Sequence, residues 1–513
     1  MTPVEPDRRR RDLTPCLLYP QLLERGGGLT RAVVERASLF VRHYEQVVIF
    51  TTSFSPRLEA TLASLRQRGA LDERVTVRNF FRDSRWAHRL GEPPEAELTA
   101  LAAGGMVSER QQLPDGRYFR IVDRRSGDVY PHGYRYYAPD GRLMMTSRTA
   151  YGRRHEVSAT KHGLVPRKVN WSTLLAEWVD EEMAALPRPV LFSVQRRFSD
   201  PVLLASRRAV WKVASLHNCH YEDAEDPSQG IRWNFQGLLD NPLAVDEIVC
   251  LTEQQCRELM TDVPEAVVRS IPYPGRPPRE APAEKDLSLV VLVGQLVDRK
   301  RIDHAIRAFA RVVKTLPQAR LEIYGEGEER RALRRLIKEL RLEKSVVLMG
   351  YSHTVNHAQA RAACTLLTST FEGYGRVIGE SMSLGTPVIA YDVRYGPRDL
   401  IRDGVDGVLL AEHTPDALAD AIIRLLSDPQ RALEMGARAR ELIERFPVED
   451  FERAWLDVLS RVSSTRGRTL ATIRRKNVRR VAQRRLRRAL SPQVRRAIAR
   501  RVRRTIAERG RRG

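Results

Sequence analysis

Two glutamates, Glu372 and Glu380, are the side chains in this sequence whose type and spacing best suit chemistry on a ligand. The first directly precedes a glycine turn, Gly373, Tyr374 and Gly375. A carboxylate accepts paired hydrogen bonds from vicinal hydroxyls, and glycine lets the backbone approach a ligand closely. The pattern predicts a site that holds a nucleotide sugar by both ends. The alternative is a pair of solvated charges or partners of a helix dipole.

The elements around this pair are those of half a nucleotide-binding unit. The turn leads into a short helix that ends at Gly385, and a buried strand follows over Pro387–Tyr391. The first amides of such a helix point outward at the positive end of its dipole, which suits a diphosphate. Upstream, strand, turn and helix patterns repeat from Leu287 onward. They predict a doubly wound parallel sheet.

A second α/β region precedes this one. A strand at Leu17–Tyr19 leads to a triple glycine that includes Gly27 and Gly28, and then to a helix. This turn suits backbone contact with a phosphate, although three glycines alone also make a plain flexible turn. A linker rich in proline at about 274–282 separates the two regions.

Two histidines follow a strand over Trp211–Leu216 in this first region. His217 and His220 lie where open α/β sheets place their ligands, beyond the carboxyl ends of the strands. A metal site is disfavoured because no third ligand follows at a recognisable spacing. The remaining alternative is a surface or capping histidine.

Between about 75 and 158 the sequence changes to short alternating runs rich in Tyr, Arg and Val. Turns at 126–128 and 140–141 predict hairpins, and thus an antiparallel sheet inserted into the first region. The insertion is either a structural decoration or a surface for a polyanionic chain.

Length and composition restrict the class of protein. The 513 residues suffice for two or three domains, and the hydrophobic fraction of 42% is that of a globular protein. No apolar run reaches the roughly 18 residues of a membrane span, and no signal-like core follows the basic start. Five scattered cysteines without a CxxC pair predict reduced thiols, without disulfides or zinc. We therefore expect a cytoplasmic protein.

The positive charge is concentrated at the C-terminus. Residues 461–513 contain 21 Arg and Lys and one acid, so this segment carries +20 of the net charge of +23 and the rest only +3. The tail has apolar residues at helical spacing, which would allow an amphipathic helix interrupted at Pro492. Three interpretations of the tail are open: it docks on an anionic membrane, it attracts acidic polymer or nucleic acid, or it is disordered.

The segment from Glu372 to Glu380, with its glycines, resembles the signature of retaining GT-B glycosyltransferases of the glycosyltransferase family 4 type. Residues 392–400, DVRYGPRDL, resemble more narrowly the poly(glycerol-phosphate) alpha-glucosyltransferases of wall teichoic acid synthesis. The resemblance implies two Rossmann-like domains facing a cleft. The expected divisions are 1–285, with the insertion at about 75–158, then 286–462 and a basic tail, 463–513.

The resemblance also assigns roles. Glu372 would be catalytic, and a histidine would contact the donor sugar near the reacting carbon. His217 is the better match by placement, with His220 close behind. Lys300 matches the lysine that binds the donor's diphosphate, whereas Gln295 replaces the usual arginine. Arg299 or Arg301 is expected to supply the missing charge. The other implied donor-binding residues are Glu380, Gly27, Gly28, Gly373, Tyr374 and Gly375.

The implied activity is transfer of a hexose, expected to be glucose, from a UDP-sugar to hydroxyls of a poly(glycerol phosphate) or similar teichoic acid polymer, with anomeric configuration kept. No Asp-x-Asp pattern occurs, so we expect metal independence and no cofactor. The implied partners are the donor, the anionic polymer, an anionic membrane at 463–513 and a homo-oligomer through the insertion. Alternatives are transfer to a glycolipid or other cell-surface glycan, and a degenerate nucleotide- or nucleic-acid-binding protein.

Overall fold

The computed structural model describes the chain from Asp12 to Ser464 with gaps. The described residues are 12–24, 27–55, 57–83, 106–112, 119–125, 133–137, 143–150, 154–159, 167–207, 211–276 and 284–464. They form two compact units. The first unit contains the described part of 1–214, together with 230–246 and 462–464, and the second contains 215–229 and the described part of 247–461. The basic tail after residue 464 lies outside the described residues.

The first sheet has seven strands in the order β13-β12-β11-β10-β1-β2-β3. Their bounds, in that order, are Val268–Ser270, Glu247–Cys250, Trp211–Ser215, Pro189–Ser193, Thr14–Tyr19, Val48–Thr51 and Thr76–Asn79. The central strand β1 pairs in parallel with β10 on one side and β2 on the other. The direction in which strands are added therefore reverses between β1 and β10. Such a switch point is where open α/β sheets bind ligands.

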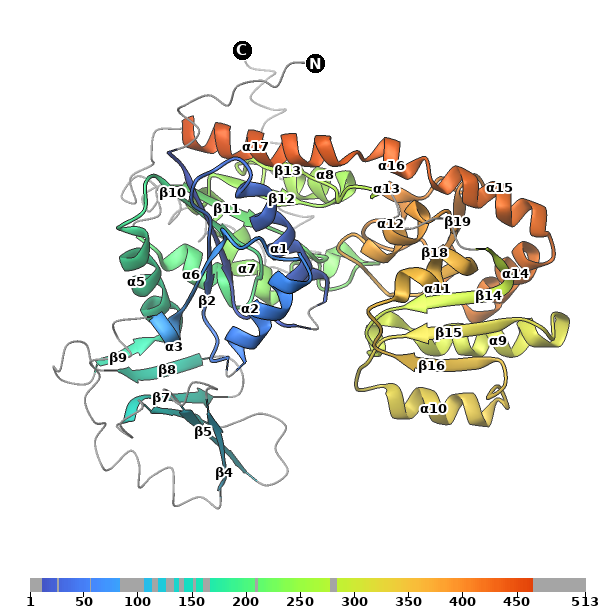
Figure 1. Ribbon diagram of the computed structural model, residues 1–513, viewed down its shortest axis with the longest axis horizontal. Coiled ribbons are helices and arrows are strands. Elements are labelled where there is room, and N and C mark those ends of the chain that lie inside the picture. The colour runs from blue at the N-terminus through green and yellow to red at the C-terminus, as the bar shows by residue number, and fades with distance from the viewer. Residues whose placement is uncertain are drawn as a thin grey trace, which may run out of the picture. The chain divides into compact units, whose positions relative to one another are not determined.

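The second sheet has six parallel strands in the order β16-β15-β14-β17-β18-β19 (Figure 1). Their bounds, in that order, are Val346–Gly350, Arg320–Tyr324, Asp286–Val293, Ala362–Leu367, Val388–Tyr391 and Gly407–Leu410. Its switch point lies between β14 and β17. The predicted α/β class with two parallel sheets is confirmed.

Helices connect these strands in each unit. Those of the first sheet's connections are α1 (Gly28–Phe40), α2 (Leu58–Gln67), α3 (Phe80–Asp83), α5 (Trp171–Met183), α6 (Ser199–Ala205), α7 (Trp233–Leu239) and α8 (Glu253–Asp262). The others are α9 (Ile302–Thr315), α10 (Arg330–Glu339), α11 (Val355–Arg361), α12 (Arg376–Ser383), α13 (Pro397–Leu400), α14 (Pro415–Leu426), α15 (Pro429–Ala439), α16 (Leu442–Arg445) and α17 (Val448–Ser464). Alternate residues of β14 and β15 pack with α9, α10 and α14 in one buried core, as strand and helix periodicity require.

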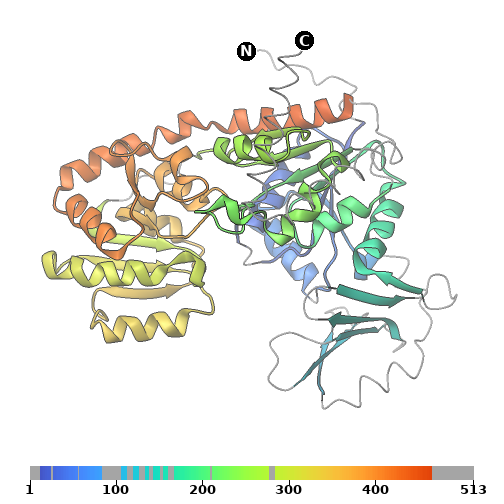
Figure 2. The same cartoon turned by 180° about the vertical axis from the view of Figure 1, so that it is seen from behind.

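A third sheet is antiparallel and belongs to the first unit (Figures 1 and 2). Its strands follow chain order, β4 to β9. Their bounds are Met106–Gln112, Phe119–Arg125, Gly133–Tyr137, Leu143–Ala150, Arg154–Ala159 and Arg167–Asn170. The β-rich insertion is thus confirmed, but its expected extent was wrong at both ends. Thr76–Asn79 pairs in parallel with β2, so the first sheet's pairing overrides the local alternation, and the insertion's last strand ends at Asn170. The predicted hairpin turns lie outside the described residues.

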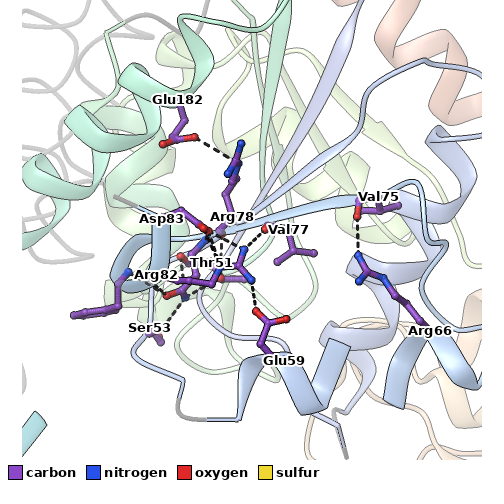
Figure 3. Close-up of polar contacts among 12 residues, drawn as sticks. Thr51, Ser53, Glu59, Arg66, Val75, Val77, Arg78, Arg82, Asp83 and Glu182 are labelled. Atoms are coloured by element: carbon purple, nitrogen blue, oxygen red, sulfur yellow. Dashed lines mark hydrogen bonds and ion pairs between the residues drawn. The ribbon is translucent and has the colours of Figure 1, made fainter. Parts of the chain in front are cut away.

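Aromatic and charged side chains stabilise the place where the insertion joins the first sheet. Phe81 of α3 stacks on Tyr136 of β6, with ring centroids 4.7 Å apart. Figure 3 shows the polar contacts beside it: Arg82 bonds to Asp83, to Glu59 of α2 and to the Val77 carbonyl. These contacts join α2, β3 and α3 where the chain leaves the first sheet.

Candidate active site

Two loops meet at the switch point of the second sheet. One follows β14 and contains the turn Asp298–Lys300, and the other follows β17 and contains Glu372. The loops bond to each other: the Thr368 hydroxyl donates to the Lys300 carbonyl (2.7 Å), and the Thr370 amide to the Arg299 carbonyl (2.9 Å). The topology therefore brings together two segments that are about seventy residues apart.

Glu372 and Lys300 form a direct ion pair within these loops. Lys300 Nζ lies 2.5 Å from Glu372 Oε1, and the side chains are only 16% and 11% exposed. The Ser369 hydroxyl donates to the same oxygen (2.6 Å), and Arg299 lies 4.0 Å away. Burial acts to raise the pKa of the Glu372 carboxyl, but Lys300 and Arg299 outweigh it, so this pKa is lowered. Glu372 is therefore ionised at neutral pH.

The glycines beside Glu372 are required by close packing. A Cβ on Gly373 would lie 2.0 Å from the His217 carbonyl oxygen, so any side chain would displace the backbone there. Gly375 has φ of +75°, a conformation that favours glycine, and it directly precedes α12. These two positions bring the His217 segment and the N-terminus of α12 to Glu372.

Tyr374 is a buried support of the site and does not present its hydroxyl to solvent. The hydroxyl donates to the Tyr273 carbonyl (2.8 Å), and the two rings meet edge to face with centroids 5.4 Å apart. Burial raises the pKa of Tyr374, so it stays protonated. Its donor-binding role was predicted from the sequence and stays a prediction, and its hydroxyl already has a partner within the protein.

His217 is positioned by Tyr273. The Tyr273 hydroxyl lies 3.1 Å from His217 Nδ1, and Arg376 of α12 lies over the Tyr273 ring at 4.3 Å. The histidine, the tyrosine and the start of α12 are thereby connected. His217 therefore lies beside the turn that contains Glu372, and its contact with the donor sugar stays a prediction.

His220 lies in different surroundings. Its side chain is fully buried, stacked on the Tyr395 ring at 5.9 Å, with Tyr395 Oη and Gln255 Nε2 close to Nδ1 (3.2 and 3.3 Å). Nε2 lies 3.3 Å from Asp262 of α8. These contacts connect the loop to α8 and to the loop after β18, so the geometry favours a positioning role for His220.

The remaining predicted donor-binding residues are placed as follows. Glu380 lies on α12 with its side chain about a quarter exposed, 3.8 Å from Arg376. The Arg299 guanidinium lies 5.2 Å from the Phe371 ring centroid, and Gln295 is exposed. Gly27 and Gly28 belong to the first unit, at the start of α1.

Sequence reasoning missed residues that support this site. Tyr273 connects Tyr374, Arg376 and His217, although the sequence identifies it only as part of a linker. Gly325 is also required by close packing, because a Cβ there would lie 1.8 Å from the Gly294 carbonyl oxygen. The available signal was the position of this glycine directly after β15.

Comparison with known proteins identifies part of the chain. The family of glycosyl transferases group 1 matches residues 278–442, which contain both loops of the site. This part of the chain is a group 1 glycosyltransferase domain. The matched residues contain the segments from Glu372 to Glu380 and 392–400, on which the resemblance was based.

Curated relatives extend the comparison. The poly(glycerol-phosphate) alpha-glucosyltransferase of Bacillus subtilis (strain 168) is 27% identical over 303 residues, 58% of this chain and 44% of that protein. The poly(ribitol-phosphate) alpha-N-acetylglucosaminyltransferase of Staphylococcus aureus (strain COL) is 29% identical over 253 residues, 48% of this chain and 50% of that protein. The chain thus spans about half the length of these relatives.

A solved structure supports the fold. A mutant of S. aureus TarM, crystallised with Fondaparinux, alpha-GlcNAc-glycerol and UDP, superposes with a TM-score of 0.67 and 18% identity, covering 86% of this chain and 99% of that one. The likeness establishes the GT-B fold. Among the described residues, no helix is long and apolar enough to cross a membrane. Nor do His, Cys, Asp and Glu residues in that part of the chain gather as a metal site of three or more.

Proposed function

We propose that the protein is a retaining glycosyltransferase that transfers a hexose, glucose in the first instance, from a UDP-sugar to a hydroxyl of a poly(glycerol phosphate) or similar teichoic acid polymer. The observation that supports this most is the Lys300–Glu372 pair at the switch point of a group 1 domain. It sets a cation for a diphosphate beside a carboxylate for a sugar. The relatives are named for transfer to poly(glycerol phosphate) and poly(ribitol phosphate), which suggests the acceptor class.

The donor's diphosphate would be held by Lys300, by Arg299 and by the first amides of α12. These groups offset negative charge that increases as the diphosphate leaves, without a metal ion. Glu380, further along α12, would accept hydrogen bonds from the ribose hydroxyls. Gly27 and Gly28 stay predicted donor contacts.

In the proposed reaction, the acceptor oxygen forms a bond to the anomeric carbon while the bond from that carbon to the UDP oxygen breaks. The departing phosphate takes the acceptor's proton and UDP leaves. The configuration is kept because the acceptor attacks on the face from which UDP departs. Glu372 is ionised and would stabilise positive charge at the anomeric carbon. His217, oriented by Tyr273, would bind the sugar hydroxyls.

The test is release of UDP from UDP-glucose and from UDP-N-acetylglucosamine, with and without poly(glycerol phosphate) and with a chelator. We expect chelator-resistant release that depends on the polymer and is lost in Glu372→Gln. Configuration is read by NMR of the product's anomeric proton. Release that ignores the polymer would refute the acceptor, an inverted product would refute retention, and loss with chelator would refute metal independence.

We also propose a division of the chain at residues 285 and 462, a cytoplasmic location, peripheral binding of 463–513 to an anionic membrane, and oligomer formation through the insertion. Deleting residues after 464 should reduce sedimentation with anionic vesicles and leave transfer to soluble polymer intact. Unchanged sedimentation would refute the membrane role.

A further inference from the structure

An exposed aromatic pair lies in the first unit, on segments that contain none of the residues assigned to the donor. Trp233, the first residue of α7, is 57% exposed, and Phe198, directly before α6, is 39% exposed. Tryptophan is a residue that proteins bury for most of its surface. Among the exposed large apolar side chains in the described part of the chain, Trp233 is the most exposed.

A guanidinium joins the two rings. Arg197 lies 5.2 Å from the Phe198 ring centroid and 5.9 Å from that of Trp233, both within the range of a cation–π contact. The helices beneath are anchored by buried residues such as Leu203 of α6 and Leu238 of α7, and the two helices pack together. We call Arg197, Phe198 and Trp233 the aromatic platform. Its parts are held on packed helices, so binding would order little that is not already ordered.

The platform belongs to the switch point of the first sheet. Its loop begins where β10 ends, at Ser193, which pairs with Leu18 of β1. The direction of strand addition reverses between these two strands, so this edge is where the topology places a ligand. Most residues assigned to the donor follow strands of the second sheet, whereas Gly27 and Gly28 follow β1 of this first sheet.

The same loop contains polar atoms that suit a ligand with hydroxyl groups. Asp200 is 2% exposed; its Oδ1 accepts from the Ser193 hydroxyl (2.6 Å) and lies 3.0 Å from Arg196. Asp200 Oδ2 and the Ser199 hydroxyl are buried without a hydrogen-bond partner among the residues the structure describes. Buried polar groups are normally satisfied. These two could bond to a ligand's hydroxyls.

From these observations we propose that the aromatic platform binds the acceptor polymer, with its rings against the C–H faces of polyol or sugar units and Arg197 against a phosphodiester. This proposal rests on the proposed function. Aromatic faces supply contact area at little entropic cost, and guanidinium matches phosphate geometry. An anionic polyol chain provides both chemical groups in each repeat.

The decisive measurement is the KM for acceptors of two different lengths. Wild type, Trp233→Ala and Arg197→Ala are assayed with a long poly(glycerol phosphate) and with a single glycerol phosphate unit. For each variant we expect the KM for the long polymer to rise about tenfold, which equals loss of one contact of about 1.4 kcal/mol. kcat and the KM for the donor should change little, since the platform meets only the acceptor. The rise in KM should be smaller with the single unit.

Conservative and matched variants separate the platform from general effects. Trp233→Phe keeps an aromatic face and should retain most of the affinity, whereas Arg197→Lys keeps the charge but loses the planar group and should retain less. Leu433→Ala, a change at an exposed site of α15, is the matched control. Direct binding of the polymer to the Glu372→Gln protein, with and without Trp233→Ala, gives a readout besides turnover.

Each failure has its own signature. If wild type transfers sugar to the polymer but Trp233→Ala and Arg197→Ala keep its KM and binding, the platform is refuted and the proposed function stands. If wild type shows no transfer to any polyol phosphate, the proposed acceptor itself fails. Loss of binding to phosphatidylglycerol vesicles in Trp233→Ala, with an unchanged KM for polymer, would overturn the proposal in favour of a membrane contact.

Discussion

Replacing Lys300 by Met should destabilise the second unit, because it leaves a buried carboxylate without its main partner. Glu372 is 11% exposed at its side chain, and Lys300 Nζ is 2.5 Å from it. After the change the carboxylate keeps the Ser369 hydroxyl at 2.6 Å and Arg299 at 4.0 Å. Loss of the lysine should also raise the pKa of Glu372.

The size of the effect follows from these contacts. Removing one member of a buried ion pair costs about 3–5 kcal/mol. Since Arg299 remains within reach, we expect the lower end, about 3 kcal/mol. In a domain of this size 1 kcal/mol shifts the melting temperature by about 2–4 °C, so Lys300→Met should lower it by roughly 6–12 °C.

The assay is scanning calorimetry of a double-mutant cycle at neutral pH with Lys300→Met, Glu372→Gln and both changes together. The double variant has neither buried charge, so we expect it to be more stable than the sum of the single effects predicts, by at least about 1 kcal/mol. Lys338→Met, at an exposed site of α10, is the control and should shift stability by less than about 0.5 kcal/mol. Additive effects, or a shift of under 2 °C for Lys300→Met, would refute the reasoning.

Three further predictions concern Gly373 and Tyr273 of the second unit and Asp200 of the first. Gly373→Ala should reduce kcat/KM for transfer at least about a hundredfold. The new Cβ would lie 2.0 Å from the His217 carbonyl oxygen and would displace that backbone, and a misplacement of about 1 Å in an active site can cost this much. A near-normal kcat/KM would contradict this. Tyr273→Phe removes the hydroxyl 3.1 Å from His217 Nδ1 and should lower kcat several-fold while circular dichroism and melting stay near wild type; an unchanged kcat and pH profile would argue against the positioning role. Burial raises the pKa of Asp200 from 3.8 to about 6. Between pH about 4 and 6 the folded protein therefore holds a proton on Asp200 that the unfolded chain has lost, and the stability should fall as pH rises through this range. In Asp200→Asn the melting temperature should depend less on pH between about 4 and 6, and an unchanged pH dependence would contradict the raised pKa of Asp200.

The sequence predicts part of the local structure around the site. The glycine turn at Gly373 and Gly375 and the helix after it were expected from residue type and spacing, and α12 begins directly after Gly375. The strand β17 before Glu372 was not predicted. The meeting of Glu372 with Lys300 therefore follows only from the sheet order, in which β14 and β17 are neighbours.

Contacts that depend on packing could not be read in this way. The sequence favours His217 over His220 only by its placement at the strand end, and only the tertiary contacts show that His220 is buried against Tyr395 and Asp262. Trp233 gave no signal, because an aromatic residue opening a helix is usually expected to face the core. Thr76–Asn79 was misassigned because alternation describes an edge strand of a parallel sheet as well as a hairpin strand.

In the proposed function, the ion pair would let one site bind a donor that has two unlike parts. Without donor, Lys300 keeps Glu372 charged although burial opposes that charge. We infer that a bound donor replaces this contact at both ends: its diphosphate attracts Lys300, and its sugar hydroxyls bond to Glu372. Each residue then retains a charged or hydrogen-bonded partner, so neither is left buried and unpaired. As the diphosphate leaves, its increasing negative charge strengthens the contact with Lys300, while Glu372 faces the positive charge that develops on the sugar.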